Sequence, residues 1–264
     1  MSAEPMVAKA MLHYGEEPPI SGSFGTGAVF FSGCTLRCSF CQNREISFEG
    51  VGKSTNQLRR IFEQLIDEGA QSIDLVTPTH FLPDILPALT PKLPVPVVYN
   101  CGGYESVETL KRLEGLVDIY LPDFKYSDNR LAEHLSKVSD YYEVAAAAIL
   151  EMYRQAGPVV MEDGIMQRGV LLRHLVLPGF VDNSLGVIDW VSEHFSGEEI
   201  LFSLMRQYTP MGNLPAPLNR RVTDEEYAAC ESWMEFCGIT NGFTQGADAA
   251  TTELLPDFNL DGVL

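Results

Sequence analysis

One stretch decides the fold: residues 27–47, which read GAVFFSGCTLRCSFCQNREIS. A short apolar run leads directly into Cys34, Cys38 and Cys41, and the aromatic Phe40 precedes the last of them. The spacing Cys-x3-Cys-x2-Cys supplies three thiolates, whereas a closed structural metal site needs a fourth ligand. If the metal is an iron-sulfur cluster, one iron is left without a cysteine and is free to bind another group.

The charge balance argues against two classes of partner. The 264 residues carry a net charge of −18, from 36 acidic and 18 basic side chains. The summed field repels phosphate backbones and anionic membranes, so we expect no nucleic acid and no membrane as partner. We expect no signal peptide or transmembrane segment. The six cysteines, three of them clustered, differ from the disulfide framework of a small secreted domain, which favours a reducing, cytoplasmic location.

The order of elements predicts an α/β fold. From Ala28 onward, short apolar runs alternate with amphipathic helical stretches, which is typical of strand-helix units on a parallel sheet. The expected strands are residues 28–32, 72–76, 95–99, 118–121, 165–177 and 200–204. Asp163-Gly164 predicts a hairpin turn that leads into the fifth strand. Thr223 and Glu226 predict a capping box that starts a last helix, Asp224 to Phe236.

Three regions are expected along the chain. Residues 1–26 form an N-terminal extension with a short helix near Glu4 to Leu12, residues 27–210 form the core, and residues 211–264 form a C-terminal helix and tail that pack on the core. Six strand-helix units fit an open barrel. The glycines between Gly22 and Gly27 are no phosphate loop, because they precede a strand instead of following one.

Unusual polar side chains follow the predicted strands. The cysteines come after the first strand, Thr77 to His80 after the second, Asn100 after the third, and Asp123 and Lys125 after the fourth. In parallel α/β folds, functional groups gather at the carboxyl ends of the strands, where several loops converge on one ligand. We therefore expect these residues around one cavity.

The motif Cys34-Thr-Leu-Arg-Cys38-Ser-Phe40-Cys41 resembles the signature of the radical S-adenosylmethionine (SAM) superfamily. With Ser32-Gly33 before it, Gln42-Asn43 after it, and Val117-Asp-Ile-Tyr-Leu-Pro-Asp123-Phe-Lys125 downstream, the chain resembles the branch of uncharacterised homologues of pyruvate formate-lyase activating enzymes. The resemblance extends over residues 20–210, and the cysteine motif contributes most of it.

The resemblance implies a partial (β/α)6 TIM-like barrel that holds a [4Fe-4S] cluster on Cys34, Cys38 and Cys41. S-adenosyl-L-methionine chelates the fourth iron through its amino and carboxylate groups. Reductive cleavage then gives methionine and a 5'-deoxyadenosyl radical that abstracts hydrogen from a substrate. The resemblance also implies cofactor contacts for Phe40, beside the adenine, for Lys125 of the Asp123-x-Lys125 pair, at the methionine carboxylate, and for Asn100 and Arg173.

The second strand end departs from the family pattern. Activating enzymes have Gly-Gly-Glu there to receive the methionine amino group, whereas this chain has Thr77-Pro78-Thr79-His80. We expect hydroxyls and backbone carbonyls at Thr77, Thr79 and His80 to accept those hydrogen bonds, with a smaller electrostatic contribution than a carboxylate gives. The departure indicates a branch distinct from the standard activases.

Several alternatives stand beside these interpretations. The cysteine loop also fits a zinc site completed by a distant ligand, and Asp123 and Lys125 also fit a solvated ion pair. Cys101, and the stripe that contains Cys230 and Cys237, are expected in the core. His80 is as compatible with a structural role as with a site role. His174 should point away from its neighbour Arg173.

The predicted function is that of a radical SAM enzyme acting without oxygen, with no catalytic residue assigned. The first substrate hypothesis is hydrogen abstraction from a glycine of a protein, as in the activation of a glycyl radical enzyme. The second is radical modification of a small molecule or peptide, and a further class is a non-catalytic iron-sulfur electron carrier or sensor. Because the chain has no second set of clustered cysteines, an external one-electron donor of the flavodoxin or ferredoxin type is implied.

Overall fold

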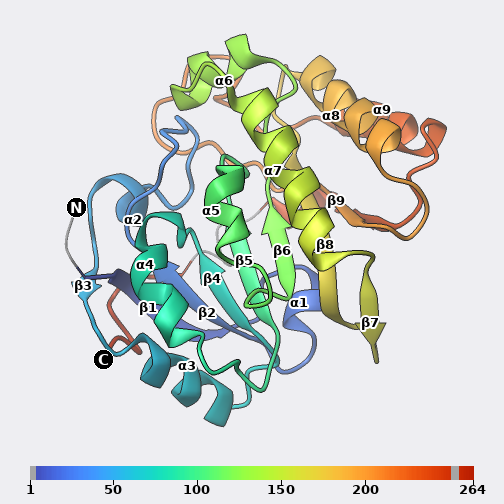
Figure 1. The fold of residues 1–264 in the computed structure, drawn as a ribbon. Helices are drawn as coiled ribbons and strands as arrows, with labels where there is room; N and C mark the ends of the chain where they lie inside the picture. Colours follow the sequence, from blue (N-terminus) through green and yellow to red (C-terminus); the bar gives the residue numbers. More distant parts are fainter. Residues whose placement is uncertain (1–3, 251–255) are drawn as a thin grey trace.

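The centre of the molecule is one curved sheet of ten strands, seen in a computed structural model that describes residues 4–250 and 256–264. The strands follow the order β10-β9-β8-β6-β5-β4-β2-β1-β3, and β7 pairs with β8 (Figure 1). Six parallel strands match the six predicted ones: β2 (Thr26–Phe31), β4 (Ile73–Val76), β5 (Val97–Cys101), β6 (Ile119–Pro122), β8 (Ile165–Leu175) and β9 (Leu201–Met205). The path ends at β10 and β3 without joining them, which confirms an open (β/α)6 barrel.

The predicted hairpin is also present. β7 (Val160–Glu162) pairs antiparallel with β8, and the connecting residues Asp163 and Gly164 have φ values of +49° and +82°. Two consecutive left-handed residues are the conformation of the turn that joins two strands most tightly.

The expected helix near Glu4 to Leu12 is wrong. This segment is strand β1 (Met6–His13), which pairs antiparallel with β2 and, on its other side, with β3 (Lys53–Ser54). Its alanine, methionine and leucine residues have good helix propensity, but pairing along the edge of β2 satisfies its backbone groups. A short helix on its own would have been marginal in water.

The C-terminal region adds further backbone pairing to the sheet. Strand β10 (Gly242–Thr244), which the sequence pattern did not indicate, runs parallel to β9. Farther along, the amide of Ala10 donates to the carbonyl of Asp261 at 2.9 Å, and the amide of Leu260 donates to the carbonyl of Ala8 at 3.1 Å. Residues 1–3 and 251–255 of the two predicted extensions lie outside the described residues.

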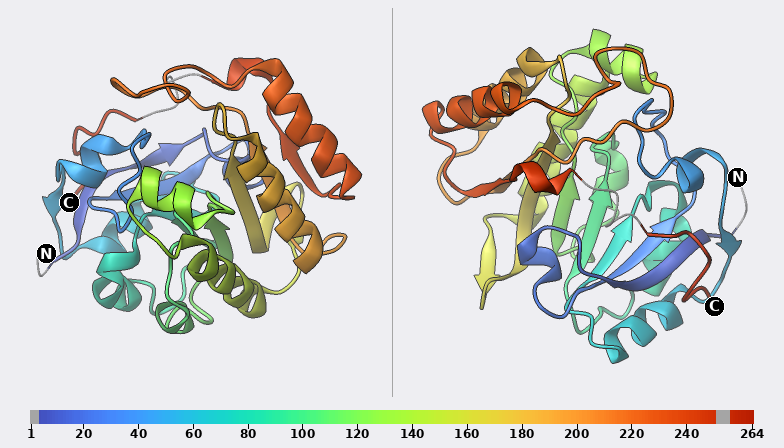
Figure 2. Two further views of the ribbon diagram at one scale, coloured as in Figure 1. Left: turned by 90° about the horizontal axis from the view of Figure 1, so that it is seen from above. Right: turned by 180° about the vertical axis from the view of Figure 1, so that it is seen from behind.

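Helices cover one face of the sheet, as the views from above and behind show (Figure 2). They are α3 (Leu58–Asp67), α4 (Leu82–Ala88), α5 (Val107–Lys111), α6 (Asn129–Ser136), α7 (Tyr141–Ala156) and α8 (Val181–His194), with α9 (Asp224–Phe236) packed beside α8. The predicted capping box of Thr223 and Glu226 is formed. In the described part of the chain, no helix combines the length and apolarity needed to cross a membrane.

The two faces of the strands bury different side chains. Phe31, Leu75 and Tyr99 belong to the main core between sheet and helices, whereas Phe30 and Val76, one position away along their strands, pack in a separate cluster on the concave face. This alternation is the period of two that a strand imposes. On the concave face, toward the carboxyl ends, the strands carry Asn100, Asp123, Arg173 and Ser203 in place of apolar side chains.

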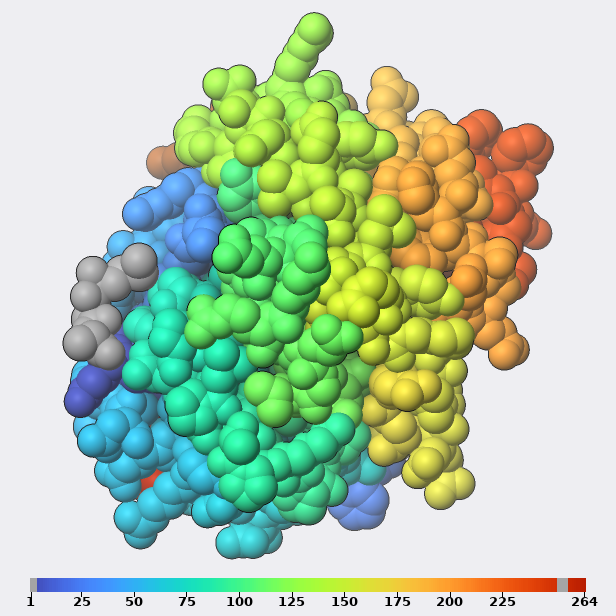
Figure 3. Space-filling view, in the orientation of Figure 1, coloured from blue at the N-terminus to red at the C-terminus, as the bar shows by residue number. Residues whose placement is uncertain are grey.

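The segment of the cysteines lies at the same end of the molecule. It connects β2 to α2 (Arg44–Phe48), and its surface, in blue, borders the light green surface of α6 (Figures 1 and 3). The amide of Arg37 donates to the carbonyl of Ser136 at 3.1 Å, and that of Ser39 to the carbonyl of Leu135 at 2.8 Å. The last turn of α6 therefore holds the cysteine loop in place.

Candidate active site

One cavity of about 480 Å³ opens on the concave face of the sheet, at the carboxyl ends of the strands. This volume is in the range of small-molecule sites. Among the residues that line it are seven of the predicted site residues: Cys38, Phe40, Cys41, Asn100, Asp123, Lys125 and Arg173. The ring centroid of Phe40 also lies 6.2 Å from the ring centroid of Tyr208. The segment β10 and the residues after it form part of the same wall through Phe243, Thr244 and Gln245.

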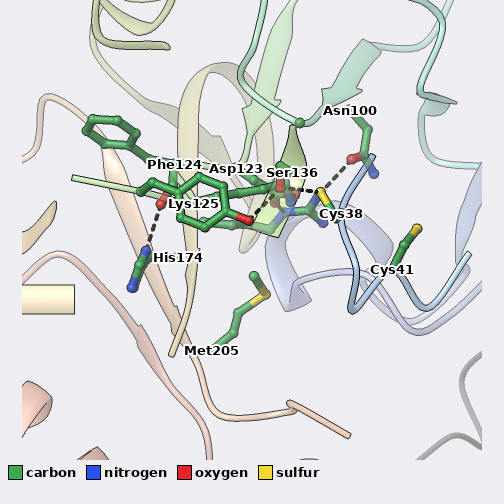
Figure 4. A network of polar contacts seen from close by, with 12 residues as sticks. Cys38, Cys41, Asn100, Asp123, Phe124, Lys125, Ser136, His174 and Met205 are labelled. Atoms are coloured by element: carbon green, nitrogen blue, oxygen red, sulfur yellow. Dashed lines mark hydrogen bonds and ion pairs between the residues drawn. The ribbon is translucent and has the colours of Figure 1, made fainter. Parts of the chain in front are cut away.

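The three cysteines of the loop are free thiols in different surroundings. Cys38 is buried and accepts a hydrogen bond from the hydroxyl of Ser136 at 3.0 Å (Figure 4), whereas Cys34 and Cys41 are half-buried. Burial raises the pKa of Cys34 to about 11 and also raises the pKa of Cys38 above its ordinary value. At neutral pH both thiols are protonated, and binding a metal displaces these protons.

The donor set fits an iron-sulfur cluster in number and chemistry. Three thiols in one loop are soft ligands, which suit a cluster and do not suit a hard cation such as Mg²⁺. Among residues 4–250 and 256–264, however, no three His, Cys, Asp or Glu side chains are grouped so as to hold a metal ion. The loop therefore brings two of its three thiols, those of Cys38 and Cys41, to the cavity, and the three sulfurs must come closer together when they share a metal.

Asp123 is at the centre of the charged groups. Its Oδ1 accepts from Nε of Arg173 at 2.9 Å, and its Oδ2 accepts from Nζ of Lys125. Burial alone would raise the pKa of Asp123, but the nearby charges of Arg173 and Lys125 outweigh it and hold this pKa below its ordinary value. Asp123 is therefore an ionised carboxylate. Its ion pair with Lys125 is not a solvated surface pair, because the two side chains are only 17% and 19% exposed.

Asn100 and Arg173 connect this pair to three carboxyl groups that the sequence did not single out. Arg173 donates to Oδ1 of Asn100 at 2.7 Å and to Oε2 of Glu16 at 2.9 Å, and it lies 3.6 Å from Oε2 of Glu17. The amide nitrogen of Asn100 donates to Asp74 at 3.2 Å. Burial raises the pKa of Glu16 well above its ordinary value and that of Asp74 to about 7.

Only one of these carboxyl groups carried a signal in the sequence. Asp74 interrupts the apolar run of β4 and is completely buried, and an acidic residue inside a buried strand is rare unless it has a partner. Its Oδ1 has no hydrogen-bond partner among the described residues. Glu16 and Glu17 precede two prolines in a loop, where acidic residues are ordinary.

The turn after β4 does not contribute side chains to the cavity lining. The hydroxyl of Thr79 donates to Glu105 at 2.6 Å and accepts from the hydroxyl of Tyr99 at 3.1 Å, behind the sheet. His80 donates from Nε2 to the carbonyl of Ser32 at 2.7 Å. Thr77 is left-handed, with φ +58°, and its amide donates to the carbonyl of Asn100 at 2.8 Å. Thr77, Thr79 and His80 are thus absent from the cavity lining, although the backbone of Thr77 is bonded to that of Asn100.

Cys34 is also absent from the residues that line the cavity. Two other predictions about side-chain direction are confirmed. His174 is buried on the helix side of β8, where Nδ1 donates to the carbonyl of Phe124 and Nε2 accepts from Ser184, and burial lowers its pKa to about 4. Cys101 and Cys230 are buried in the main core, and Cys237 packs against that core from a half-buried position.

Comparison with known proteins places this arrangement in a family. A model of the Radical SAM superfamily matches residues 28–191. The uncharacterized protein MJ0674 of Methanocaldococcus jannaschii is 30% identical over an alignment of 230 residues, and the match covers 81% of this chain and 62% of that protein. The chain therefore spans less than two thirds of this relative.

Solved structures of SuiB share the fold at low sequence identity. SuiB of Streptococcus suis bound to S-adenosylmethionine has a TM-score of 0.57 and 14% identity over 86% of this chain and 52% of SuiB. SuiB bound to its precursor peptide SuiA has a TM-score of 0.52 and 18% identity over 84% of this chain and 49% of SuiB. A domain of pyruvate-formate lyase-activating enzyme from Bacteroides vulgatus matches with a TM-score of 0.41 and 12% identity over 72% of this chain and 89% of that domain. Because the family model matches well over half of the residues and the open barrel agrees with it, the chain belongs to the Radical SAM superfamily.

Proposed function

We propose that this protein cleaves S-adenosylmethionine reductively and uses the resulting radical to abstract hydrogen from a substrate. One observation carries the proposal. Cys38 and Cys41 of the three-thiol loop open into the same cavity as Asn100, Asp123, Lys125 and Arg173, a set of groups suited to an amino acid moiety. A zinc site or a solitary electron-carrying cluster gives no reason for these buried charges at its edge.

In this proposal the thiolates of Cys34, Cys38 and Cys41 hold a [4Fe-4S] cluster. When bound, the cluster and S-adenosylmethionine supply an electron and a cleavable sulfonium, which yield methionine and a 5'-deoxyadenosyl radical. The protein contributes ligands, orientation and exclusion of water. The hydroxyl of Ser136, which donates to Cys38, stabilises negative charge on that sulfur.

Lys125 is the proposed partner of the methionine carboxylate. Its ammonium is already fixed by Asp123, and Arg173 binds the other oxygen of the same carboxylate. A carboxylate that approaches Lys125 therefore meets an ammonium group already held in position. The negative charge of Asp123 remains balanced by Arg173. Phe40, at the wall of the cavity, is the proposed contact for the adenine.

For the methionine amino group, the proposal concerns the turn of residues 77–80. Backbone carbonyls of this turn would accept the amino protons, with Thr77 in its left-handed conformation setting their direction. The side chains of Thr79 and His80 then act as positioning groups, because they anchor the turn to Glu105 and to the carbonyl of Ser32. This arrangement replaces the carboxylate of the Gly-Gly-Glu pattern.

Hydrogen abstraction from a protein glycine is our first substrate proposal, since the cysteine motif and Asp123-x-Lys125 resemble those of activating enzymes. Radical modification of a peptide or small molecule is the second, and one observation favours it: SuiB, whose fold is similar, has a structure with its precursor peptide SuiA. Both proposals include an external one-electron donor, a cytoplasmic location and work in the absence of oxygen.

The test is anaerobic reconstitution with iron and sulfide, followed by dithionite and S-adenosylmethionine. We expect 5'-deoxyadenosine and methionine in equal amounts. Cys38→Ala should lose both the cluster absorbance and the product, whereas Cys237→Ala, at a half-buried cysteine outside the loop, should keep both. An intact cluster without 5'-deoxyadenosine would contradict the proposed function.

A second experiment separates the two substrate proposals. A glycyl radical enzyme encoded near this gene is the candidate protein substrate, and it is incubated with the reconstituted protein and S-adenosylmethionine. Electron paramagnetic resonance should then show a glycyl radical in that candidate. Absence of such a neighbour, or of the radical, favours the peptide or small-molecule proposal.

A further inference from the structure

The end of the cavity away from the cysteine loop is acidic. Glu16 and Glu17 follow β1 and precede α1 (Pro18–Ser21), and both line the cavity. This connection reaches the barrel from the amino ends of the strands, because β1 ends opposite Thr26, the first residue of β2. In Figure 1, α1 accordingly lies at the end of the sheet opposite α6. The cavity therefore extends from the thiols of the loop to two carboxyl groups that enter from the other side.

Asp74 adds a third carboxyl group to this end. It lies on the concave side of β4, since its two neighbours along the strand belong to the main core on the helix side. Asn100, which lines the cavity, donates to Oδ2 of Asp74 at 3.2 Å and to Oε1 of Glu16 at 3.3 Å. One amide thus connects the two acids. We call Glu16, Glu17 and Asp74 the acidic cluster.

The acidic cluster has fewer positive partners than carboxyl groups. Among the described residues that line the cavity, the cations at neutral pH are Lys125 and Arg173, and Asp123 binds both of them. His13 also lines the cavity, but burial lowers its pKa, so it supplies no positive charge there. The acidic cluster and Asp123 together place four carboxyl groups against two cations.

The hydrogen bonds of the acidic cluster are a second, independent observation. Asp74 is completely buried, and its Oδ1 has no hydrogen-bond partner among the described residues. The side chain of Glu17 is only 9% exposed, and its ion pair with Nη1 of Arg173 spans 3.6 Å, which is too long for a hydrogen bond. Buried carboxyl oxygens need donors, so these two acids point to a ligand that brings N–H groups.

We propose that the acidic cluster binds a cationic nitrogen group of the substrate, an ammonium or a guanidinium. The carbon chain that bears this group would extend toward the cysteines, where hydrogen is abstracted. The inference rests on the proposed function and names the substrate class of the same site: a free amine, or a basic side chain of a peptide. The cofactor's own amino group is proposed at the other end of the cavity, with Asp123 and Arg173 between it and the acidic cluster.

Protons balance the acidic cluster when no cation is bound. Burial raises the pKa of Glu16 well above its ordinary value and that of Asp74 to about 7, while Arg173 lowers and Glu17 raises both pKa values. The other titratable groups of the cavity wall are His13 from β1, Asp123 and Lys125 from the end of β6, and Cys38 and Cys41 from the loop. An entering cation lowers the pKa of each carboxyl group, so binding near pH 7 should release protons.

The test measures binding by isothermal titration calorimetry to the cluster-loaded protein with S-adenosylmethionine. Hexylamine and hexylguanidine are compared with hexan-1-ol, and a blocked tripeptide with central lysine is compared with its norleucine analogue. In at least one comparison the cation should bind about tenfold or more tightly than its neutral partner, and that comparison tells a free amine from a peptide. Titrations in buffers of different ionisation enthalpy should show release of up to about one proton per bound cation.

Glu17→Gln keeps the size of the side chain and removes its charge, while Arg173 retains Glu16 and Asp123 as partners. This variant should bind the cation about tenfold more weakly and lose the preference over the neutral partner. Glu108→Gln, at an exposed position of α5, is the matched control for the general attraction of a chain of net charge −18, and it should change binding less than about twofold. Melting temperatures report whether both variants are folded.

Three results would overturn the proposal. The first is equal binding of cation and neutral partner by the wild type, a comparison that needs no variant. The second is an equal loss in Glu17→Gln and Glu108→Gln. The third is a Glu17→Gln variant that binds S-adenosylmethionine about tenfold more weakly and the cation as well as the wild type does, because the acidic cluster would then serve the cofactor.

Dithionite distinguishes this inference from the proposed function, because binding of the cation needs no turnover. If dithionite and S-adenosylmethionine yield no 5'-deoxyadenosine while the cation still binds in a manner that depends on Glu17, the proposed function fails and the cation site stands. If 5'-deoxyadenosine forms and no cation is preferred, the cation site fails and the proposed function stands.

Discussion

At the scale of single residues, the carboxylate of Asp123 holds two cations, Arg173 and Lys125, in fixed positions. It binds Arg173 and Lys125 with separate oxygens, and all three side chains are largely buried. An ammonium fixed in this way can receive a ligand carboxylate with little loss of rotamer entropy. Lys125 therefore lends itself to a direct test of the cofactor site.

Lys125→Ala should weaken the binding of S-adenosylmethionine about tenfold or more, because a charge-assisted hydrogen bond contributes on the order of 1.5–3 kcal/mol. Iron content should stay unchanged, since Lys125 is no proposed cluster ligand. Equilibrium dialysis of labelled S-adenosylmethionine, combined with iron analysis, measures both quantities. Lys111→Ala, at an exposed lysine of α5, is the control, and loss of iron in Lys125→Ala would contradict the assigned role.

Asp74 gives a prediction about pH. Burial raises its pKa from 3.8 to about 7, so the folded state binds a proton that the unfolded state releases at lower pH. The free energy of unfolding should therefore fall as pH rises from about 4 to about 7, by a few kcal/mol at most. Asp74→Asn cannot ionise, and it should melt at a higher temperature than wild type at pH about 8.

The difference between Asp74→Asn and wild type should disappear at pH about 4, where Asp74 is protonated in the folded protein. Thermal unfolding followed by circular dichroism across this range checks the prediction. Asp67→Asn, at an exposed position of α3, should show no such trend. An equal difference at both pH values would mean that ionisation of Asp74 has no part in the effect.

At the scale of elements, the sequence was most informative where local pattern and tertiary environment agree. All six predicted parallel strands exist, because buried apolar runs bounded by glycine and proline have few alternatives. Met6–His13 was misjudged because its composition favours a helix, and only its pairing with β2 makes it a strand. The three residues of β10 are too few to produce a pattern.

The candidate site was predictable to a similar degree. The rule that strand ends converge placed Cys38, Cys41, Asn100, Asp123 and Lys125 together, and the family resemblance added Arg173. The directions of Thr79 and His80 were not accessible, because a turn has no fixed side-chain period. Their hydrogen-bond partners, Glu105 and the carbonyl of Ser32, are distant in sequence, so a local sequence pattern could not predict these contacts.

Strand β10 is expected to hold one wall of the cavity. A Cβ atom at Gly242 would lie only 1.9 Å from the carbonyl oxygen of Phe202 in the neighbouring strand β9. Gly242→Ala should therefore separate β10 from β9 and release Gln245, which accepts from the amide of Arg206 at 2.7 Å. Hydrogen exchange should become faster in residues 242–245 and 205–207, with β5 as the internal control. Unchanged exchange there would show that β10 does not depend on this close contact.

At the scale of the whole molecule, two parts of the chain meet at one cavity. The loop after β2 brings the thiols, and the concave ends of β5, β6 and β8 bring Asn100, Asp123 and Arg173. The loop has three cysteines, one ligand fewer than a closed metal site needs. Polar side chains at the ends of distant strands lie at the same cavity.

The most direct test of this account asks whether S-adenosylmethionine binds the open iron of a cluster held by the loop. The reconstituted protein is reduced and mixed with S-adenosylmethionine that carries ¹⁵N in its amino group and ¹⁷O in its carboxylate, and electron-nuclear double resonance is recorded on the reduced cluster. The account predicts hyperfine couplings from both labels. A reduced cluster that shows neither coupling in the presence of saturating S-adenosylmethionine would contradict it.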